Sequence, residues 1–413
     1  MKIWLINHYA VPPQYYPLAR PSLFAKKLIK MGHDVVIIAA STVHNSDQNL
    51  IEDKEKTKKI VDDGVTYILV KCINYKGNGL KRVVNILQFA HSLPNVLADL
   101  EEPDVIVATS FDPFTCYSGI KYGKKKKIKT IAEIADLWPE TLISYGGISE
   151  KSIIVKFLRR IEKQIYIHAD AIVFTMEGAY RYIEAQKWTK EISESKVYYI
   201  NNGVDNELFI YNRDNYQIED SDLEDKEKFK IVYTGSIRKV NNLGVLLDTA
   251  KLIKDKNILF LVWGDGDELN ELKERVVREH IENVRFKGRV YKQYIPYIIS
   301  KADLNIAHNG QSELFRYGIS FNKIFEYLAA GKPILCDFNS DFNPVIQNRA
   351  GVEVKTANPK DIASEIIRLS QIDKSEYIEM CDNALNTSKQ YDFELLTQKL
   401  LMVINTIKME GKE

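Results

Sequence analysis

Short apolar runs alternate with helical patterns of apolar and polar residues along nearly the whole chain. Such runs predict buried strands, and their alternation with helices is typical of parallel sheets wound with helices. In the first half of the chain we expect strands at residues 3–7, 34–39, 66–70, 104–108, 130–134, 171–175 and 197–200. In the second half we expect them at residues 230–234, 259–263, 284–286, 304–307, 333–337 and 352–354.

These two series predict an α/β protein with two Rossmann-like, doubly wound domains facing a cleft, because such sheets bind ligands beyond the carboxyl ends of their strands. With 413 residues, the chain has room for two cores. The acidic segment 211–228 lacks periodicity and predicts a linker. We therefore expect an N-terminal domain at 1–210, a C-terminal domain at 229–390 and an amphipathic last helix within 391–413.

Composition and charge narrow the possible functions. The apolar content of 45% and charged content of 27% are ordinary for a folded soluble protein, and the net charge of +1 does not favour nucleic-acid binding. No window holds 18 consecutive apolar residues, so we expect any membrane contact to be peripheral. The four cysteines lack metal-ligand spacing, which favours reduced thiols in a cytoplasmic protein.

Two neighbouring segments of the first domain bear on membrane contact. Six lysines fall between Lys121 and Lys129, and a predicted helix from Leu80 to Leu93 carries apolar residues at helical spacing. Core packing explains such an apolar stripe more often than membrane binding does. The lysine run supports the alternative, in which both segments contact an anionic membrane surface.

The most informative motif lies between the strands at 304–307 and 333–337. A loop from Gly318 to Phe321 leads into a predicted helix at 322–330, where Lys323 in the first turn opposes the helix dipole. An anion bound there would relieve that conflict, and Glu326, one turn later, is placed to reach a sugar diol. A nucleotide carries both groups. The alternative is a plain surface ion pair between Lys323 and Glu326.

A second basic turn follows the strand at 230–234, where Gly235 and Ser236 precede Arg238 and Lys239. Taken alone it is an ordinary loop, but two basic turns at one sheet edge can converge on a single diphosphate. The segment 264–267, Gly-Asp-Gly-Asp, predicts a tight turn that lets a nucleotide base approach the backbone at Gly264. Its two carboxylates are the alternative, a metal site, but no third ligand lies nearby and we expect no metal.

The first domain offers three candidate residues that could bind or activate a second substrate. Asp136 follows the strand at 130–134, where it can orient or deprotonate a hydroxyl group, or simply cap its loop. His8 ends the first strand, where a histidine is more often a hydrogen-bond partner of the loop than a catalyst. Arg20 is a possible contact for an acceptor phosphate and equally an ordinary surface residue.

Together these residues resemble glycosyltransferase family 4, whose members are retaining nucleotide-sugar transferases of the two-domain GT-B architecture. Within it the chain is similar to bacterial enzymes that build capsule, O-antigen and related surface polysaccharides on a lipid carrier. The resemblance covers essentially the whole length. It rests on RPSLFAKKLIKMGHDVVII at 20–38, DLWPE at 136–140, NNGVD at 201–205, YTGSIRK at 233–239, GDGDE at 264–268, FKGRV at 286–290 and SFNKIFEYLAAGKPI at 320–334.

The resemblance implies a role for each matching residue. Glu326 would hold the donor ribose, and the last helix would cross back to the N-terminal domain. The diphosphate would lie between Lys323, Asn322 and the backbone near Ser320 on one side and Gly235, Ser236 and Arg238 on the other. Arg289 and Val290 would flank the base. The chain departs from the family pattern at Gly318, where an acid is usual, at Ser236 and Asn241, where Arg and Lys are usual, and at 15–17, where Tyr-Tyr-Pro replaces a glycine pair.

The expected activity is transfer of a sugar, hexosyl or N-acetylhexosaminyl, from a UDP-sugar to a lipid-linked saccharide with retention at the anomeric carbon. The donor's own phosphate oxygen would take the acceptor proton, with Asp136 as the alternative base. We expect a cytoplasmic protein, peripheral on the inner face of the membrane. The alternatives are a nucleotide-sugar epimerase or hydrolase of the same architecture, and an inactive subunit that binds a nucleotide sugar.

Overall fold

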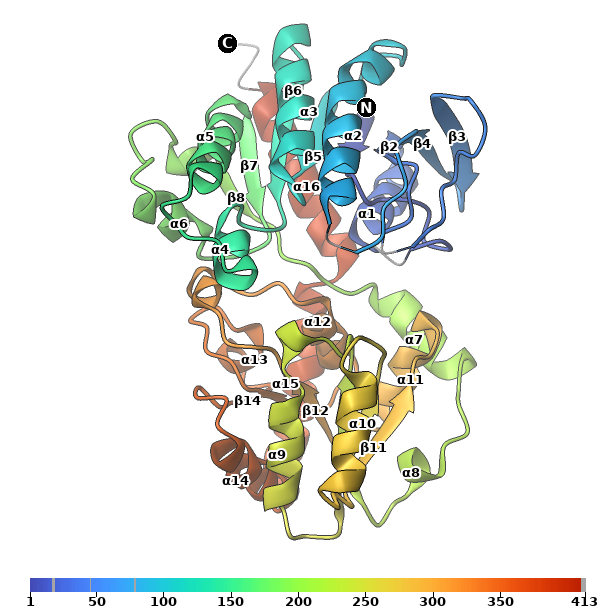
Figure 1. Ribbon diagram of the computed structural model, residues 1–413, viewed down its shortest axis with the longest axis vertical. Helices are drawn as coiled ribbons and strands as arrows, with labels where there is room; N and C mark the ends of the chain where they lie inside the picture. Colours follow the sequence, from blue (N-terminus) through green and yellow to red (C-terminus); the bar gives the residue numbers. More distant parts are fainter. Residues whose placement is uncertain (17–18, 45, 78, 410–413) are drawn as a thin grey trace. The chain divides into compact units, whose positions relative to one another are not determined.

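A computed structural model describes residues 1–16, 19–44, 46–77 and 79–409, and it divides into two compact units (Figure 1). Unit 1 comprises Met1–Asn201 together with the chain from Phe393 onward, and unit 2 comprises Asn202–Asp392. Each unit is a sheet of mainly parallel strands with helices on its faces. The predicted α/β class with two doubly wound domains is therefore confirmed.

Unit 1 holds an eight-stranded sheet in the order β3-β4-β2-β1-β5-β6-β7-β8. Its strands are β1 Lys2–Ile6, β2 Asp34–Ala40, β3 Thr57–Asp62, β4 Val65–Val70, β5 Val105–Thr109, β6 Lys129–Ile134, β7 Ala171–Phe174 and β8 Val197–Tyr199. Its helices are α1 Ala19–Lys30, α2 Leu80–Ala98, α3 Pro113–Lys126, α4 Glu140–Gly146, α5 Ile153–His168, α6 Ala179–Ala185 and α16 Phe393–Met409.

Strand β3 is the one strand of unit 1 that the apolar pattern does not predict. It is an edge strand whose side chains are mostly exposed. Because these side chains are not buried, its sequence contains no continuous apolar run. It pairs antiparallel with β4 through a two-residue turn at Asp63 and Gly64, both with positive φ. An Asp-Gly pair is a strong local signal for such a hairpin, and it was the signal available in the sequence.

Helix α16 packs with α1 on one face of the unit 1 sheet. The rings of Phe24 and Phe393 meet edge to face at 5.4 Å, and Leu400, Val403 and Ile407 are buried in the same core. The last helix, expected within 391–413, thus belongs to unit 1 although the whole of unit 2 precedes it. Residues 410–413 of that range lie outside the described chain.

Unit 2 holds a six-stranded parallel sheet in the order β11-β10-β9-β12-β13-β14. Its strands are β9 Phe229–Thr234, β10 Ile258–Trp263, β11 Val284–Gly288, β12 Leu304–Ala307, β13 Ile334–Cys336 and β14 Gly351–Glu353. Its helices are α7 Asn206–Asn215, α8 Ser221–Glu224, α9 Gly244–Leu252, α10 Leu269–Arg278, α11 Ile295–Ser300, α12 Asn322–Ala329, α13 Pro344–Gln347, α14 Pro359–Ser370 and α15 Lys374–Gln390.

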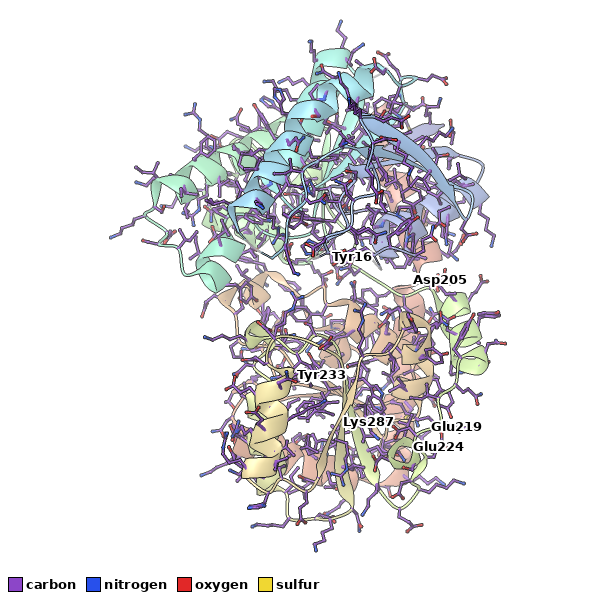
Figure 2. The ribbon with its side chains drawn as sticks, turned by 45° about the vertical axis from the view of Figure 1, so that its right-hand side comes forward. Tyr16, Asp205, Glu219, Glu224, Tyr233 and Lys287 are labelled. Carbon is purple, nitrogen blue, oxygen red and sulfur yellow. The ribbon has the colours of Figure 1, made fainter. Side chains whose placement is uncertain are left out.

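The segment 211–228, expected to be a linker, is instead part of unit 2. Helix α7 occupies its start and α8 its centre, and Leu223 is buried in the unit 2 core. Lys287 forms ion pairs with Asp220 and Asp222, so the acidic run is partly neutralised by a residue far along the chain. Figure 2 labels Lys287 and, from the acidic run, Glu219 and Glu224. The boundary between the units therefore follows Asn201, nine residues before the predicted one.

Candidate functional site

Two loops at the carboxyl edge of the unit 2 sheet are in backbone contact. They follow the neighbouring strands β9 and β10, and the amide of Gly235 donates to the carbonyl of Trp263 at 3.0 Å. Gly264 has a φ of 154°, and a Cβ placed there would lie 1.8 Å from the carbonyl oxygen of Gly235. Only glycine fits at this position, so the turn predicted at Gly264 braces the turn at Gly235.

Lys323 reaches the same loop from the first turn of α12. Its Nζ lies 4.4 Å from the ring centre of Tyr233 and donates to the Tyr233 hydroxyl at 3.3 Å. A Cβ added at Gly235 would come within 3.2 Å of this ammonium group. Burial lowers the pKa of Lys323, and the nearby Tyr327 and Asp337 oppose that effect. The two basic turns predicted from the sequence therefore lie together, around Gly235 and Lys323 (Figure 2 labels Tyr233).

The basic side chains of the second basic turn, at residues 235–239, are open to solvent. Arg238 and Lys239 are exposed, and Arg238 forms no ion pair within the described part of the chain. The side-chain amide of Asn241 donates to both the carbonyl and the hydroxyl of Ser236, at 2.6 and 2.7 Å. Asn241 thus lies within this turn, and helix α9 begins only at Gly244.

A buried histidine that sequence reasoning missed, His308, supports the loop after β9 through a hydrogen bond to its backbone. His308 follows β12 and Asp337 follows β13, and the His308 Nδ1 contacts the Asp337 carboxylate at very short range. The His308 Nε2 donates to the carbonyl oxygen of Asn242 at 2.9 Å. Both ring nitrogens thus face oxygen atoms of neighbouring loops, so His308 links the Asp337 carboxylate to the backbone at Asn242. Finding this pair requires knowing that β12 and β13 are neighbours.

The remaining donor-side candidates occupy different environments. Glu326 forms an ion pair with Lys292, so the surface pair with Lys323 is not formed. The Ser320 hydroxyl and carbonyl accept from the backbone and side-chain amides of Asn202, at 3.2 and 2.8 Å. Asn322 and Arg289 are exposed, whereas Val290 packs against the unit 2 core.

In unit 1, His8 is buried and hydrogen-bonded. Its Nε2 lies 2.7 Å from the Asn85 Oδ1, and its ring contacts Tyr9 and Phe89 edge to face. Burial lowers the pKa of His8 to about 3, so the ring is neutral at physiological pH. The Nδ1 has no hydrogen-bond partner among the described residues. A direct contact between His8 and an acceptor remains a prediction.

Arg20 does not occupy the solvent-accessible position that was expected. It is 7% exposed, its Nε pairs with Glu133 at 2.9 Å, and its terminal nitrogens donate to the carbonyls of Ile200 and Asn201. The guanidinium thus ties α1 to β6 and to the end of β8. The alternative of an ordinary surface residue is therefore wrong. A contact between Arg20 and an acceptor phosphate remains a prediction, and it would require the guanidinium to exchange these partners.

Two carboxyl groups share the carboxyl edge of the unit 1 sheet. Burial raises the pKa of Asp136, after β6, and that of Asp112, after β5, to about 6 each, and the positive charge of Arg82 partly opposes both shifts. Asp112 accepts from the amide of Thr115 at 2.7 Å and caps α3. No hydrogen bond to Asp136 is found in the described chain. Sequence reasoning missed Asp112, although an Asp-Pro pair after a strand is a helix-start signal.

The two segments predicted to contact a membrane lie toward opposite ends of two neighbouring helices, α2 and α3. Helix α2 buries Ile86, Phe89 and Leu93, so part of the predicted stripe is core. The lysines from Lys121 onward lie toward the carboxyl end of α3, whereas the exposed apolar residues of α2 begin at its amino end. None of the helices in the described ranges has the length and hydropathy of a membrane span.

Both halves of the chain match models of known glycosyltransferase families. Residues 228–371 match the family model described as glycosyl transferases group 1, and residues 23–208 match the model of glycosyltransferase family 4. The probable glycosyltransferase WbjE of Pseudomonas aeruginosa is 24% identical over 209 residues, which is 50% of each protein. The chain spans about half the length of the curated relatives it matches.

Solved structures match the chain over nearly its whole length. Sucrose-phosphate synthase of Thermosynechococcus elongatus matches with a TM-score of 0.75 and 15% identity, over 99% of each chain. Anabaena HepE in complex with UDP matches with a TM-score of 0.68 and 13% identity, over 98% of this chain and all of that one. At these identities the likeness shows the fold, and the predicted GT-B architecture is confirmed.

Proposed function

The chain belongs to the glycosyltransferases of family 4, and from this premise we propose that it transfers a sugar from a nucleoside diphosphate sugar to a hydroxyl group. We further propose that a UDP-sugar is the donor, that a lipid-linked saccharide of bacterial surface polysaccharide synthesis is the acceptor, and that the anomeric configuration is retained. The transferred group is a hexosyl or N-acetylhexosaminyl unit.

The observation that carries the proposal is the meeting of Lys323 with the turn at Gly235. The ammonium group lies beside a glycine whose missing side chain leaves the backbone open, and Arg238 extends from the same turn. A departing diphosphate gathers negative charge as its bond to the sugar breaks. Fixed cations and a helix start lower the energy of that charge most when they are already in place before the reaction.

In the proposed reaction the bond between the anomeric carbon and the diphosphate oxygen breaks while a bond to the acceptor oxygen forms. The acceptor proton passes to a phosphate oxygen of the leaving diphosphate, with Asp136 as the alternative base. Lys323 and Arg238 stabilise the diphosphate without a metal ion. Glu326 holds the donor ribose, an assignment that requires it to exchange its ion pair with Lys292 for the diol.

Two findings on similar proteins support the finer assignments. The solved Anabaena protein was captured with UDP, which favours a UDP-linked donor here. A curated relative in Bacillus subtilis is named for teichuronic acid biosynthesis, which favours a cell-surface polysaccharide as the product. We place the reaction at the inner face of the cell membrane, where lipid-linked saccharides and nucleotide sugars meet.

The donor assignment is tested by Lys323→Ala and Arg238→Ala, each assayed for sugar transfer to a membrane extract. We expect each to lower turnover by about 10²-fold or more, because each removes a charge that meets the developing diphosphate. Lys360→Ala is the matched control, since Lys360 is exposed on α14, and it should keep wild-type turnover. Wild-type turnover in both test variants would contradict the assignment.

The reaction class is tested by mass spectrometry of the products formed from a panel of UDP- and GDP-sugars with membranes of the native host. A sugar added to a lipid-extractable product is the expected result. Release of free sugar or of an altered nucleotide sugar without acceptor would favour an epimerase or hydrolase. Donor binding without any product would favour an inactive subunit that binds a nucleotide sugar.

A further inference from the structure

Helix α2 carries an apolar stripe on its solvent side, in addition to its buried face. The stripe comprises Leu80, Val83, Val84 and Leu87, spaced at i, i+3, i+4 and i+7, and Leu80 is 84% exposed. Core packing, the more common explanation for such spacing, therefore does not apply to these four residues. We name them the α2 stripe.

Helix α5 repeats this feature at its own amino end. Ile153, Ile154 and Phe157 are exposed, at 84% for Ile153 and 54% for Phe157, while the neighbouring Val155 and Leu158 are buried. We name the three exposed residues the α5 stripe. Single exposed apolar residues are normal on any protein, but two clustered stripes on the helices of one layer are not.

The two stripes lie at the same end of the unit 1 helix layer. Helix α3 packs against both α2 and α5, as Figure 1 shows, and the Ser118 hydroxyl of α3 donates to the Ala90 carbonyl of α2. Toward the carboxyl ends, the Lys124 Nζ of α3 lies 2.9 Å from the Nδ1 of His168 in α5. Each of the three helices lies between two strands that run parallel in the unit 1 sheet, so the helices run in the same direction, with their amino ends together.

Because the amino ends of the helices lie together, the basic residues near the apolar stripes are not those of the lysine run in α3. The run from Lys124 to Lys127 ends α3, at the far end of the layer from Leu80 and Ile153. The cations beside the stripes are instead the exposed Lys81 of α2 and Lys151, Lys156 and Arg160 at the start of α5. Glu150, in the same region, is paired with Arg159 at 3.0 Å.

We propose that the α2 and α5 stripes together dock onto an anionic lipid bilayer. The apolar side chains would enter the boundary between headgroups and acyl chains, and the flanking cations would contact the headgroups, which is the arrangement of interfacial amphipathic helices. The helix layer then faces the bilayer with the edge that also bears Asp112 and Asp136. The docking surface goes beyond the proposed transfer reaction and does not require it.

The test uses the full chain and sedimentation with vesicles of phosphatidylcholine that contain about one third phosphatidylglycerol. We expect Leu80→Ser with Leu87→Ser to lower the partition constant about tenfold or more, and Ile153→Ser with Phe157→Ser to do the same. Both variants change exposed side chains, so an unchanged circular dichroism spectrum and melting curve should accompany the loss. Binding to pure phosphatidylcholine should be weaker than to the mixed vesicles.

Matched controls separate this surface from others. Val277→Ser removes an isolated valine of unit 2 that is 74% exposed, and Lys125→Gln with Lys127→Gln alters the lysine run; both should stay within about twofold of wild type. Wild-type binding by both stripe variants, or loss only in the lysine variant, overturns the proposal. The proposal is also overturned if a stripe variant binds vesicles normally but has a different oligomeric mass in solution from the wild type. The stripes would then join two copies of the chain.

The vesicle assay contains no nucleotide sugar, so its failure and that of the transfer proposal are distinguishable. A stripe variant that loses vesicle binding should retain turnover on a detergent-solubilised acceptor. Conversely, Lys323→Ala should bind vesicles as the wild type does. Loss of both properties in one variant with an altered melting curve would count against a local role for the stripe.

Discussion

Both sheets end their parallel strands at a carboxyl edge, but the loops at these two edges carry opposite chemistry. In unit 2 the edge offers Lys323 and Arg238 around glycine turns, whereas in unit 1 it offers Asp112 and Asp136 with a neutral His8. The comparison shows that the fold determines where loops lie, at the carboxyl edge of each sheet. The charge at that edge depends on the side chains that the loops carry. A cationic edge suits a departing diphosphate, and an edge with carboxyl groups suits a hydroxyl that must lose its proton.

The edges also differ in how their polar groups are held. In unit 2 the partners are supplied by neighbouring loops, as when His308 contacts Asn242 and Asp337. In unit 1, by contrast, the His8 Nδ1 and one carboxylate oxygen of Asp112 are buried with no hydrogen-bond partner among the described residues. Such groups are costly in a folded protein, and they are where a hydroxyl-rich ligand gains the most from binding.

The largest expected effect tests whether the unit 1 edge supplies a base. If Asp136 takes the acceptor proton, Asp136→Asn should lower kcat by about 10²- to 10⁴-fold. Because burial raises its pKa to about 6, the wild-type kcat/KM should fall as the pH drops below that value, and this acid limb should disappear in the variant.

Asp112→Asn is the matched comparison for Asp136, since the pKa of Asp112 is also about 6 but one of its oxygens already caps α3. We expect it to retain more activity and to lower the melting temperature. If Asp136→Asn keeps kcat within about tenfold of wild type, the phosphate oxygen of the donor is the base and the carboxyl edge only positions the acceptor.

A smaller effect is expected from the histidine that supports the unit 2 turn. His308→Phe removes both hydrogen bonds that hold Asn242 and Asp337, so the turn bearing Arg238 should lose its position. We expect the KM for the donor to rise about tenfold with a smaller change in kcat, and His308→Gln to restore part of it. A fall in kcat alone, with KM unchanged, would show that His308 is not a positioning residue.

The smallest effect concerns stability and is confined to unit 1. Glu162 accepts from the hydroxyls of Tyr166 and Tyr182 at 2.7 Å each, and burial raises its pKa to about 8. A carboxyl whose pKa is raised on folding stabilises the folded state at low pH, and this contribution is lost as the pH rises from the unfolded value through about 8.

Glu162→Gln should therefore raise the melting temperature of unit 1 at pH above 8 relative to wild type, by the equivalent of a few kcal/mol at most, and change it little near pH 5. Glu184→Gln, an exposed residue of α6, is the control and should show no such dependence. A melting temperature of Glu162→Gln that follows the wild type across this pH range would mean that folding does not raise the pKa of the Glu162 carboxyl.

Several features were predictable because their signals are local. The apolar runs of β9 and β10 and the glycines that end them are visible in the sequence, and so is Lys323 at a helix start. Other features depend on partners distant along the chain. From the sequence, Arg20 resembles an ordinary loop residue, but in the structure it contacts Glu133 and the end of β8. Likewise, the sequence suggests that Glu326 pairs with Lys323, whereas in the structure it pairs with Lys292.

The sequence by itself determined the alternation of strands and helices apart from β3, α7 and α8, the family, and the two basic turns, because periodicity and glycine placement act over a few residues. Only the tertiary structure decided that the acidic segment 211–228 packs on unit 2, that His308 meets Asp337, and that the α2 stripe faces solvent. The physical reason is common to all three. Burial and charge pairing depend on which surfaces meet, and strand order brings together residues that no local pattern connects.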